Sequence, residues 1–170
     1  QELINLFEDH DTRKLVTVGT PGGFYDANGT FRALPGNTSQ TYTMKYMVEF
    51  KNQNDAKCNW KVIRYGDVLL MYAEALNENN KTDQAIGYLN QIRARAGVSP
   101  YPLGMSQADT REAIIKERRL ELSFEGVRWF DLVRWNRAYE TMSSYGMREF
   151  MTVFPLPLSQ VDLINDPTIF

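Results

Sequence analysis

The sequence of 170 residues contains one cysteine, Cys58, and one histidine, His10. A single cysteine excludes an internal disulfide framework and any cysteine-rich metal site. It also leaves a cysteine nucleophile without its usual base, because His10 lies in an unrelated polar segment. We therefore interpret Cys58 as a free thiol, and we expect neither a metal ion nor a cofactor.

Long basic runs and long apolar runs are also absent. The formal net charge is −2, and no run of basic residues is longer than the doublet at 118–119, so nucleic acid is not expected as a partner. No apolar stretch reaches the length that crosses a bilayer, and no basic-then-apolar signal segment begins at Gln1. We expect any targeting segment to lie upstream of this chain.

Residues 59–98 carry the strongest periodic signal and predict two helices joined by a tight turn. The first helix is expected to begin near Val62, and an asparagine-rich segment at 77–80 should end it. Its apolar positions repeat every three or four residues: Val68, Leu69, Tyr72, Ala73 and Leu76. The second helix is expected to open with Thr82 as its N-cap and to close at Gly97.

This helical hairpin matches one degenerate tetratricopeptide unit. The small residues Ala73 and Ala85 fall where the two helices of such a unit approach most closely. The tryptophan and the closing proline of the pattern are replaced by Leu69 and Gly97. One unit cannot bury its apolar face alone, so further packing partners are expected.

Residues 1–58 are predicted to be rich in loops, because glycine, proline and asparagine punctuate positions 20–54. A short helix is expected at the start, followed by strands over 14–18 and 41–50. Asp26, Asn28 and Gly29 resemble the beginning of a calcium loop, but the later acidic ligands are missing, so an Asx turn is predicted.

Residues 105–140 are predicted to form a second helical hairpin, which does not follow the tetratricopeptide spacing. Ser106 or Thr110 should cap its first helix, and Gly126 should break it. Residues 141–170 are expected to form an extended tail, since prolines stiffen it. The chain 1–170 is thus expected to be one region of mostly α class, with tetratricopeptide-like hairpins, long loop insertions and a few short strands.

Glu117, Glu121 and Glu125 repeat every four residues and lie along one face of the predicted helix, roughly 6 Å apart at Cβ. A glycosidase needs two carboxyl groups that face each other across a scissile bond, and a row on one face does not provide that arrangement. We therefore predict an ion-pair network and no enzyme. The candidate partners are Arg118, Arg128 and Arg134.

Two long blocks of sequence resemble the C-terminal region of the SusD/RagB family. The first comprises residues 63–76 (IRYGDVLLMYAEAL) with 89–97 (LNQIRARAG), and the second comprises residues 115–135 (IKERRLELSFEGVRWFDLVRW). Residues 7–13 (FEDHDTR) and 154–157 (FPLP) are similar to two further family segments. Thr12 stands where proline is usual, and the family's usual ending of glutamine, asparagine, proline and glycine is not seen.

The resemblance implies a nutrient-binding lipoprotein on the outer face of the outer membrane of Bacteroidetes-type bacteria. Members of the family bind glycans, or peptides in some cases, and cover a SusC-like TonB-dependent transporter. The implied partners are therefore that transporter and a glycan, with membrane contact only through a lipid anchor upstream of this chain. Ligand residues in the family come from variable loops, many of them in an N-terminal part that this chain lacks.

A sugar-binding aromatic must expose one face of its ring, with amide or acid groups nearby for the sugar hydroxyls. The residues that best meet this requirement are Phe24, Tyr25, Asp26 and Asn28. The same residues also fit a purely structural turn, so both interpretations stay open at this stage.

Two functions from different classes follow from the sequence. One is the non-catalytic binding of an oligo- or polysaccharide for uptake, as the resemblance implies. The other is a tetratricopeptide-type adaptor that holds a peptide or protein partner in the concave face of its helices. An adaptor of that kind should continue the repeat, whereas here the second hairpin departs from it.

Overall fold

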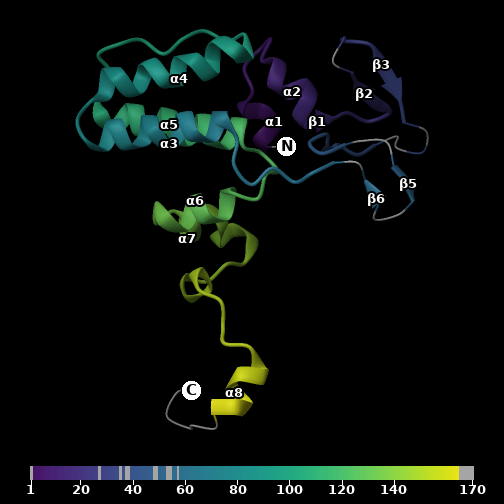
Figure 1. The fold of residues 1–170 in the computed structure, drawn as a ribbon, viewed down its shortest axis with the longest axis vertical. Helices are drawn as coiled ribbons and strands as arrows, with labels where there is room; N and C mark the ends of the chain where they lie inside the picture. Colours follow the sequence, from purple (N-terminus) through teal and green to yellow (C-terminus); the bar gives the residue numbers. More distant parts are fainter. Residues whose placement is uncertain are drawn as a thin grey trace. The chain divides into compact units, whose positions relative to one another are not determined.

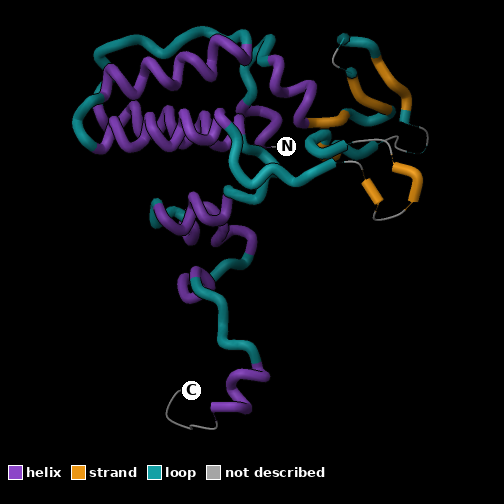
Figure 2. Tube along the Cα trace, in the orientation of Figure 1, coloured by secondary structure: helices purple, strands orange, loops and turns teal. Residues whose placement is uncertain are grey.

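The computed structural model describes residues 2–26, 28–34, 36, 39–47, 50–52, 55–56 and 58–164. The chain divides into two compact units, Gln1–Arg128 and Trp129–Phe170. Helices predominate and the few strands are short (Figure 2), which confirms the predicted fold class. The finer division of the chain into four parts stays a prediction.

Three helices form the centre of the first unit: α3 (Tyr65–Glu78), α4 (Thr82–Ala96) and α5 (Gln107–Glu121). α3 packs against both α4 and α5 (Figure 1). The buried side chains shared by the three helices make up the core: Leu69, Leu70, Ala73, Leu76, Ala85, Leu89, Ile92, Ala113 and Ile114, with Leu122 just beyond α5. α5 therefore supplies the packing partner that a single hairpin lacks.

The predicted hairpin is confirmed, with small shifts at its boundaries. α3 begins at Tyr65 instead of near Val62, because Arg64 is extended with φ −136° and ψ 162°. Asn80 adopts the left-handed conformation after α3 ends, as the asparagine-rich segment predicted. Thr82 is the first residue of α4 and not its N-cap, since Lys81 occupies that position.

The close approach of α3 and α4 is also confirmed. Ala73 and Ala85 are both fully buried in the core that the two helices share. On α5, the cap is Ser106, whose hydroxyl oxygen accepts a hydrogen bond from the backbone N–H of Asp109 at 3.0 Å. Thr110 lies buried inside the helix. Of the two predicted N-caps, Ser106 is therefore the one that the structure has.

In the N-terminal part of the first unit, the described residues form α1 (Glu2–Leu6), α2 (Thr12–Thr17) and three two-stranded antiparallel sheets. The sheets pair β1 (Val18–Gly19) with β4 (Tyr42–Thr43), β2 (Gly23–Tyr25) with β3 (Phe31–Ala33), and β5 (Phe50–Asn52) with β6 (Asp55–Ala56).

Two strand predictions are wrong in this part of the chain. Residues 14–17 belong to α2, because the carboxylate of Asp11 caps that helix by accepting a hydrogen bond from the backbone N–H of Arg13 at 3.0 Å. The strand expected over 41–50 stops after Thr43, and the chain turns at Tyr46, which has a positive φ of 63°. Val48 and Glu49 lie outside the described residues.

The second unit is a series of short helices: α6 (Arg128–Arg134), which starts on the last residue of the first unit, α7 (Ala138–Met142), η1 (Ser143–Tyr145), η2 (Glu149–Thr152) and α8 (Leu158–Ile164). The tail is thus partly helical where an extended chain was expected. The second hairpin over 105–140 stays a prediction. Within the described ranges, no helix combines the length and apolar character that crossing a bilayer requires.

Candidate functional site

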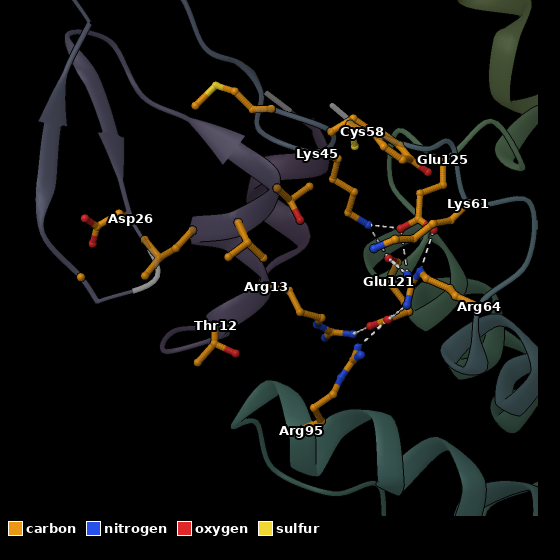
Figure 3. A pocket seen from close by; sticks show the side chains of 16 residues that line it. Thr12, Arg13, Asp26, Lys45, Cys58, Lys61, Arg64, Arg95, Glu121 and Glu125 are labelled. Atoms are coloured by element: carbon orange, nitrogen blue, oxygen red, sulfur yellow. Dashed lines mark hydrogen bonds and ion pairs between the residues drawn. The ribbon is translucent and has the colours of Figure 1, made fainter. Parts of the chain in front are cut away.

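A cavity of about 690 Å³ opens in the first unit beside the C-terminal end of α5 (Figure 3). Its walls come from α2, the β2–β3 turn, residues 45–47, residues 58–64 that precede α3, and the last turn of α4. In Figure 3, Arg13, Lys45, Arg64 and Arg95 point toward the two carboxylates of Glu121 and Glu125, whereas Asp26 lies apart from them. The site therefore gathers residues that are far apart in the sequence.

Arg64 joins the start of α3 to the end of α5. Its Nη1 donates to Oε1 of Glu121 at 2.5 Å, and its Nε donates to Oε2 of Glu125 at 2.7 Å. Its Nη2 donates to the backbone carbonyl of Glu121 at 2.6 Å and to Oε1 of Glu125 at 2.9 Å. This arginine uses all three of its nitrogens on the two carboxylates and the helix end.

Lys45 reaches the same helix end from the turn after β4. Its Nζ donates to Oε1 of Glu125 at 2.5 Å and to the backbone carbonyl of Glu121 at 2.6 Å. The last carbonyls of a helix carry partial negative charge, so cations are favourable there. Lys45 and Arg64 thus act as side-chain caps for α5.

A second group of charges lies deeper, around Glu117, whose side chain is fully buried. Arg13 donates from Nη1 to Oε2 of Glu117 at 2.8 Å, and Arg93 donates from Nη1 to Oε1 at 2.6 Å. Arg13 is held in place by Asp11, with Nη2 to Oδ2 at 2.7 Å and Nε to Oδ1 at 2.9 Å. Through these ion pairs, Asp11 and Arg13 at the start of α2 are linked to Glu117 on α5 and Arg93 on α4.

The predicted ion-pair network is confirmed, and the partners that the structure describes for its three glutamates are other residues than Arg118, Arg128 and Arg134. Pairing of those three arginines with the glutamates stays a prediction. Among the described residues, the partners come from α2, α4 and the segments before α3: Arg13, Lys45, Arg64, Arg93 and Arg95. Arg118 instead pairs with Asp67 on α3, with Nη1 to Oδ1 at 2.9 Å. Arg134 pairs with Asp131 within α6.

The electrostatics of the cavity favour ionised carboxylates. Burial opposes ionisation of Glu121, but hydrogen bonds from Arg95 and Arg64 outweigh it and lower the pKa of this carboxyl group. Burial also opposes ionisation of Glu125, and hydrogen bonds from Arg64 and Lys45 lower its pKa. A catalytic acid requires the opposite shift, since it must hold a proton near neutral pH.

The sequence-predicted sugar-binding residues lie on and beside the β2–β3 turn. The predicted Asx turn is confirmed, because Oδ1 of Asp26 accepts hydrogen bonds from the backbone N–H groups of Asn28 and Thr30, each at 3.0 Å. Asp26 also lines the cavity, whereas Phe24, Tyr25 and Asn28 are not among the lining residues. The exposed ring of Tyr25 packs edge-on against Phe31 at 5.3 Å between centroids. A glycan-binding role for these four residues stays a prediction.

Four cationic residues of the cavity were not singled out from the sequence: Lys45, Lys61, Arg64 and Arg95. No spacing rule connects them, since they come from a turn, a loop, a helix start and a helix end. The signal in the sequence was the series of acids Glu117, Glu121 and Glu125 at and just beyond the end of α5, which required cations from elsewhere. Cys58 also lines the cavity and is the predicted free thiol. No cluster of metal-binding side chains occurs in the part of the chain that the structure describes.

The model of the SusD family matches residues 1–153, and the chain belongs to this family. Two relatives from Formosa agariphila are similar to it. SusD-like protein P38 is 40% identical over 117 residues, 64% of this chain and 23% of the relative. SusD-like protein P25 is 32% identical over 96% of this chain and 32% of the relative.

Solved structures agree with this assignment. A laminarin-binding SusD-like protein is 29% identical, with a TM-score of 0.68 over 94% of this chain and 35% of that chain. A SusD superfamily protein from Bacteroides vulgatus is 30% identical, with a TM-score of 0.67 over 85% of this chain and 34% of that chain. The chain therefore spans about a third or less of the length of these relatives.

Proposed function

We propose that the protein binds glycans without catalysis at the outer-membrane surface, for uptake through a SusC-like TonB-dependent transporter. The observation that carries this proposal is membership of the SusD family over residues 1–153. A neighbour with 29% identity is a laminarin-binding SusD-like protein, which supports a polysaccharide as the ligand. Attachment through a lipid anchor upstream of this chain completes the proposal.

The charges around the cavity support binding without hydrolysis. Glu117 lies between two arginines, and Glu121 and Glu125 share Arg64. A retaining or inverting glycosidase needs one carboxyl group that keeps its proton and a second on the other side of the scissile bond. Carboxylates held by guanidinium groups do not serve as that proton donor, so they are assigned to the scaffold.

The adaptor alternative is not favoured. A tetratricopeptide adaptor presents a peptide along stacked repeats. Here the one repeat-like hairpin is followed by α5, which packs onto both of its helices and shares their core.

A panel of soluble polysaccharides that includes laminarin tests the proposal. Retardation of the chain in native gels that contain each polysaccharide is expected for at least one of them, and calorimetry then gives the affinity. Reducing-end assays on the same mixtures should show no hydrolysis above a buffer control. Absence of binding across the panel, or hydrolysis that Glu121→Gln removes, would contradict the proposal.

A further inference from the structure

The cavity beside α5 carries more positive than negative side chains. Its cationic lining residues are Arg13, Lys45, Lys61, Arg64 and Arg95. Its acidic lining residues are Asp26, Glu121 and Glu125. Five cations against three acids leave an excess of two positive charges, although the whole chain has a net charge of −2.

Among the described lining cations, Lys61 and Arg95 make the fewest hydrogen bonds to residues of the ion-pair network. Arg95 contacts Glu121 through Nη2, and 56% of its side chain remains exposed. Lys61 is exposed, and within the described residues it takes part in no ion pair. Arg13 and Arg64, by contrast, use their nitrogens on buried or half-buried carboxylates. Lys61 and Arg95 therefore keep donor capacity for a ligand.

Part of the cavity lining is apolar. Leu15, Val16 and Met47 line it and are each about half exposed, at 44%, 52% and 41%. A bare inorganic anion gains nothing from such a wall. A sugar ring does, because its C–H face packs on apolar side chains while its polar substituents reach charged groups. The volume of about 690 Å³ lies within the range of small-molecule sites.

We infer that this cavity binds an acidic saccharide, with its carboxylate or sulfate group between Lys61 and Arg95 and its ring against Leu15, Val16 and Met47. The inference rests on the proposed glycan-binding function and narrows its ligand class. Hydrogen bonds in which the donor or the acceptor is ionised are roughly twice as strong as those between neutral groups, so an ionised carboxylate or sulfate is favoured here over a neutral hydroxyl.

The test uses matched pairs of polysaccharides that differ only in charge. Oligogalacturonate and its methyl ester form one pair, and dextran sulfate and dextran form the other. Calorimetry on the full chain should give at least tenfold tighter binding for the charged member of one pair. The pair that responds distinguishes a carboxylate ligand from a sulfate ligand.

Variants then locate the site. Lys61→Gln is expected to weaken binding of the charged polysaccharide about fivefold, and Lys61→Gln with Arg95→Gln at least twentyfold. The control is Lys81→Gln with Arg111→Gln, which removes the same two charges: Lys81 is exposed, and Arg111 pairs with Glu78 away from the cavity. This control should change the affinity less than twofold. Since Arg95 also contacts buried Glu121, thermal melts verify folding, and Lys61→Gln alone keeps the test valid.

Four results would overturn the inference. Equal affinity for both members of each pair would remove the role of charge. Equal weakening by the cavity variant and the control would show general electrostatic attraction. Binding of a neutral glycan such as laminarin that Lys61→Gln leaves unchanged, with no binding of the charged polysaccharides, would keep the proposed function and reject this site. If the chain binds neither neutral nor charged polysaccharides, both the proposed function and this inference are rejected.

Discussion

At the residue scale, Glu117 joins two buried arginines in one ion-pair network. Its side chain is fully buried and accepts from Arg13 and Arg93, whose side chains are 8% and 4% exposed. Glu117→Gln removes the negative charge and leaves two buried guanidinium groups undercompensated. We expect a loss of about 3–5 kcal/mol in the free energy of unfolding, measured by urea denaturation.

The matched control is Glu78→Gln. Glu78 also pairs with an arginine, Arg111, but both side chains are about 40% exposed. Its removal should cost less than about 1 kcal/mol, because water screens exposed pairs. Similar losses in the two variants would show that the buried pair contributes no more than a surface pair.

The shifted carboxyl groups predict a dependence of stability on pH. The pKa values of Glu121 and Glu125 are lowered in the folded chain from the ordinary 4.5. A lowered folded pKa contributes stability that is fully present above the unfolded pKa and is lost as the pH falls through the folded pKa. The melting temperature should therefore fall as the pH drops from 6 toward 3. In Glu125→Gln this fall should be shallower, and an identical slope would contradict the assignment.

The acidic residues of the ion-pair network could be predicted from the sequence, but their cationic partners could not. The four-residue spacing of Glu117, Glu121 and Glu125 predicts a row of acids on one helix face. α5 carries Glu117 and Glu121 but ends at Glu121, so Glu125 lies beyond the helix. The cations that the structure pairs with these acids were not predicted, because pairs such as Lys45 with Glu125 and Arg13 with Glu117 join residues 80 and 104 positions apart. Helical periodicity carries information only over a few turns.

At the scale of the element, the C-terminal end of α4 depends on backbone conformation. Gly97 has a φ of 73°, and a Cβ atom there would meet Cγ2 of Thr12 at 3.7 Å, an ordinary contact. The cost of Gly97→Ala is therefore conformational, about 1 kcal/mol of unfolding free energy. A Cβ atom at Gly87, inside the same helix, would meet nothing within 4 Å, so Gly87→Ala should stabilise by roughly 0.5–1 kcal/mol.

These two changes are compared by chemical denaturation under identical conditions. The same substitution on the same helix is expected to give opposite signs. Equal effects would mean that the left-handed end of α4 is not maintained in solution.

The elements themselves were predictable to different degrees. α3 and α4 have long apolar periodicity and clear ends, and the sequence places both within three residues of their observed starts. A strand was predicted over residues 14–18 because this segment is short and rich in β-branched residues. The N-cap at Asp11 and the ion pair between Arg13 and Glu117 favour the helix α2 instead. Tertiary contacts thus override local preference where an element is short.

At the scale of the whole molecule, stability should be uneven. The shared core lies between α3, α4 and α5, whereas every residue of β3 is exposed. Amides in the middle of the three helices should therefore exchange with deuterium last, and those of the β2–β3 hairpin first. Hydrogen exchange read by mass spectrometry tests this order. Exchange of α5 as rapid as that of β3 would contradict the three-helix core.

The charged cavity has a consequence for the order of folding. Three of its ion pairs join residues 57, 80 and 104 positions apart, so these three form only after the long intervening segments have closed. The helical hairpin needs only local contacts and can form early. The cavity is therefore completed late and exists only in the native chain. Any molecule that occupies it acts selectively on that state, and at a concentration a hundredfold above its dissociation constant it would add about 2.7 kcal/mol to the free energy of unfolding.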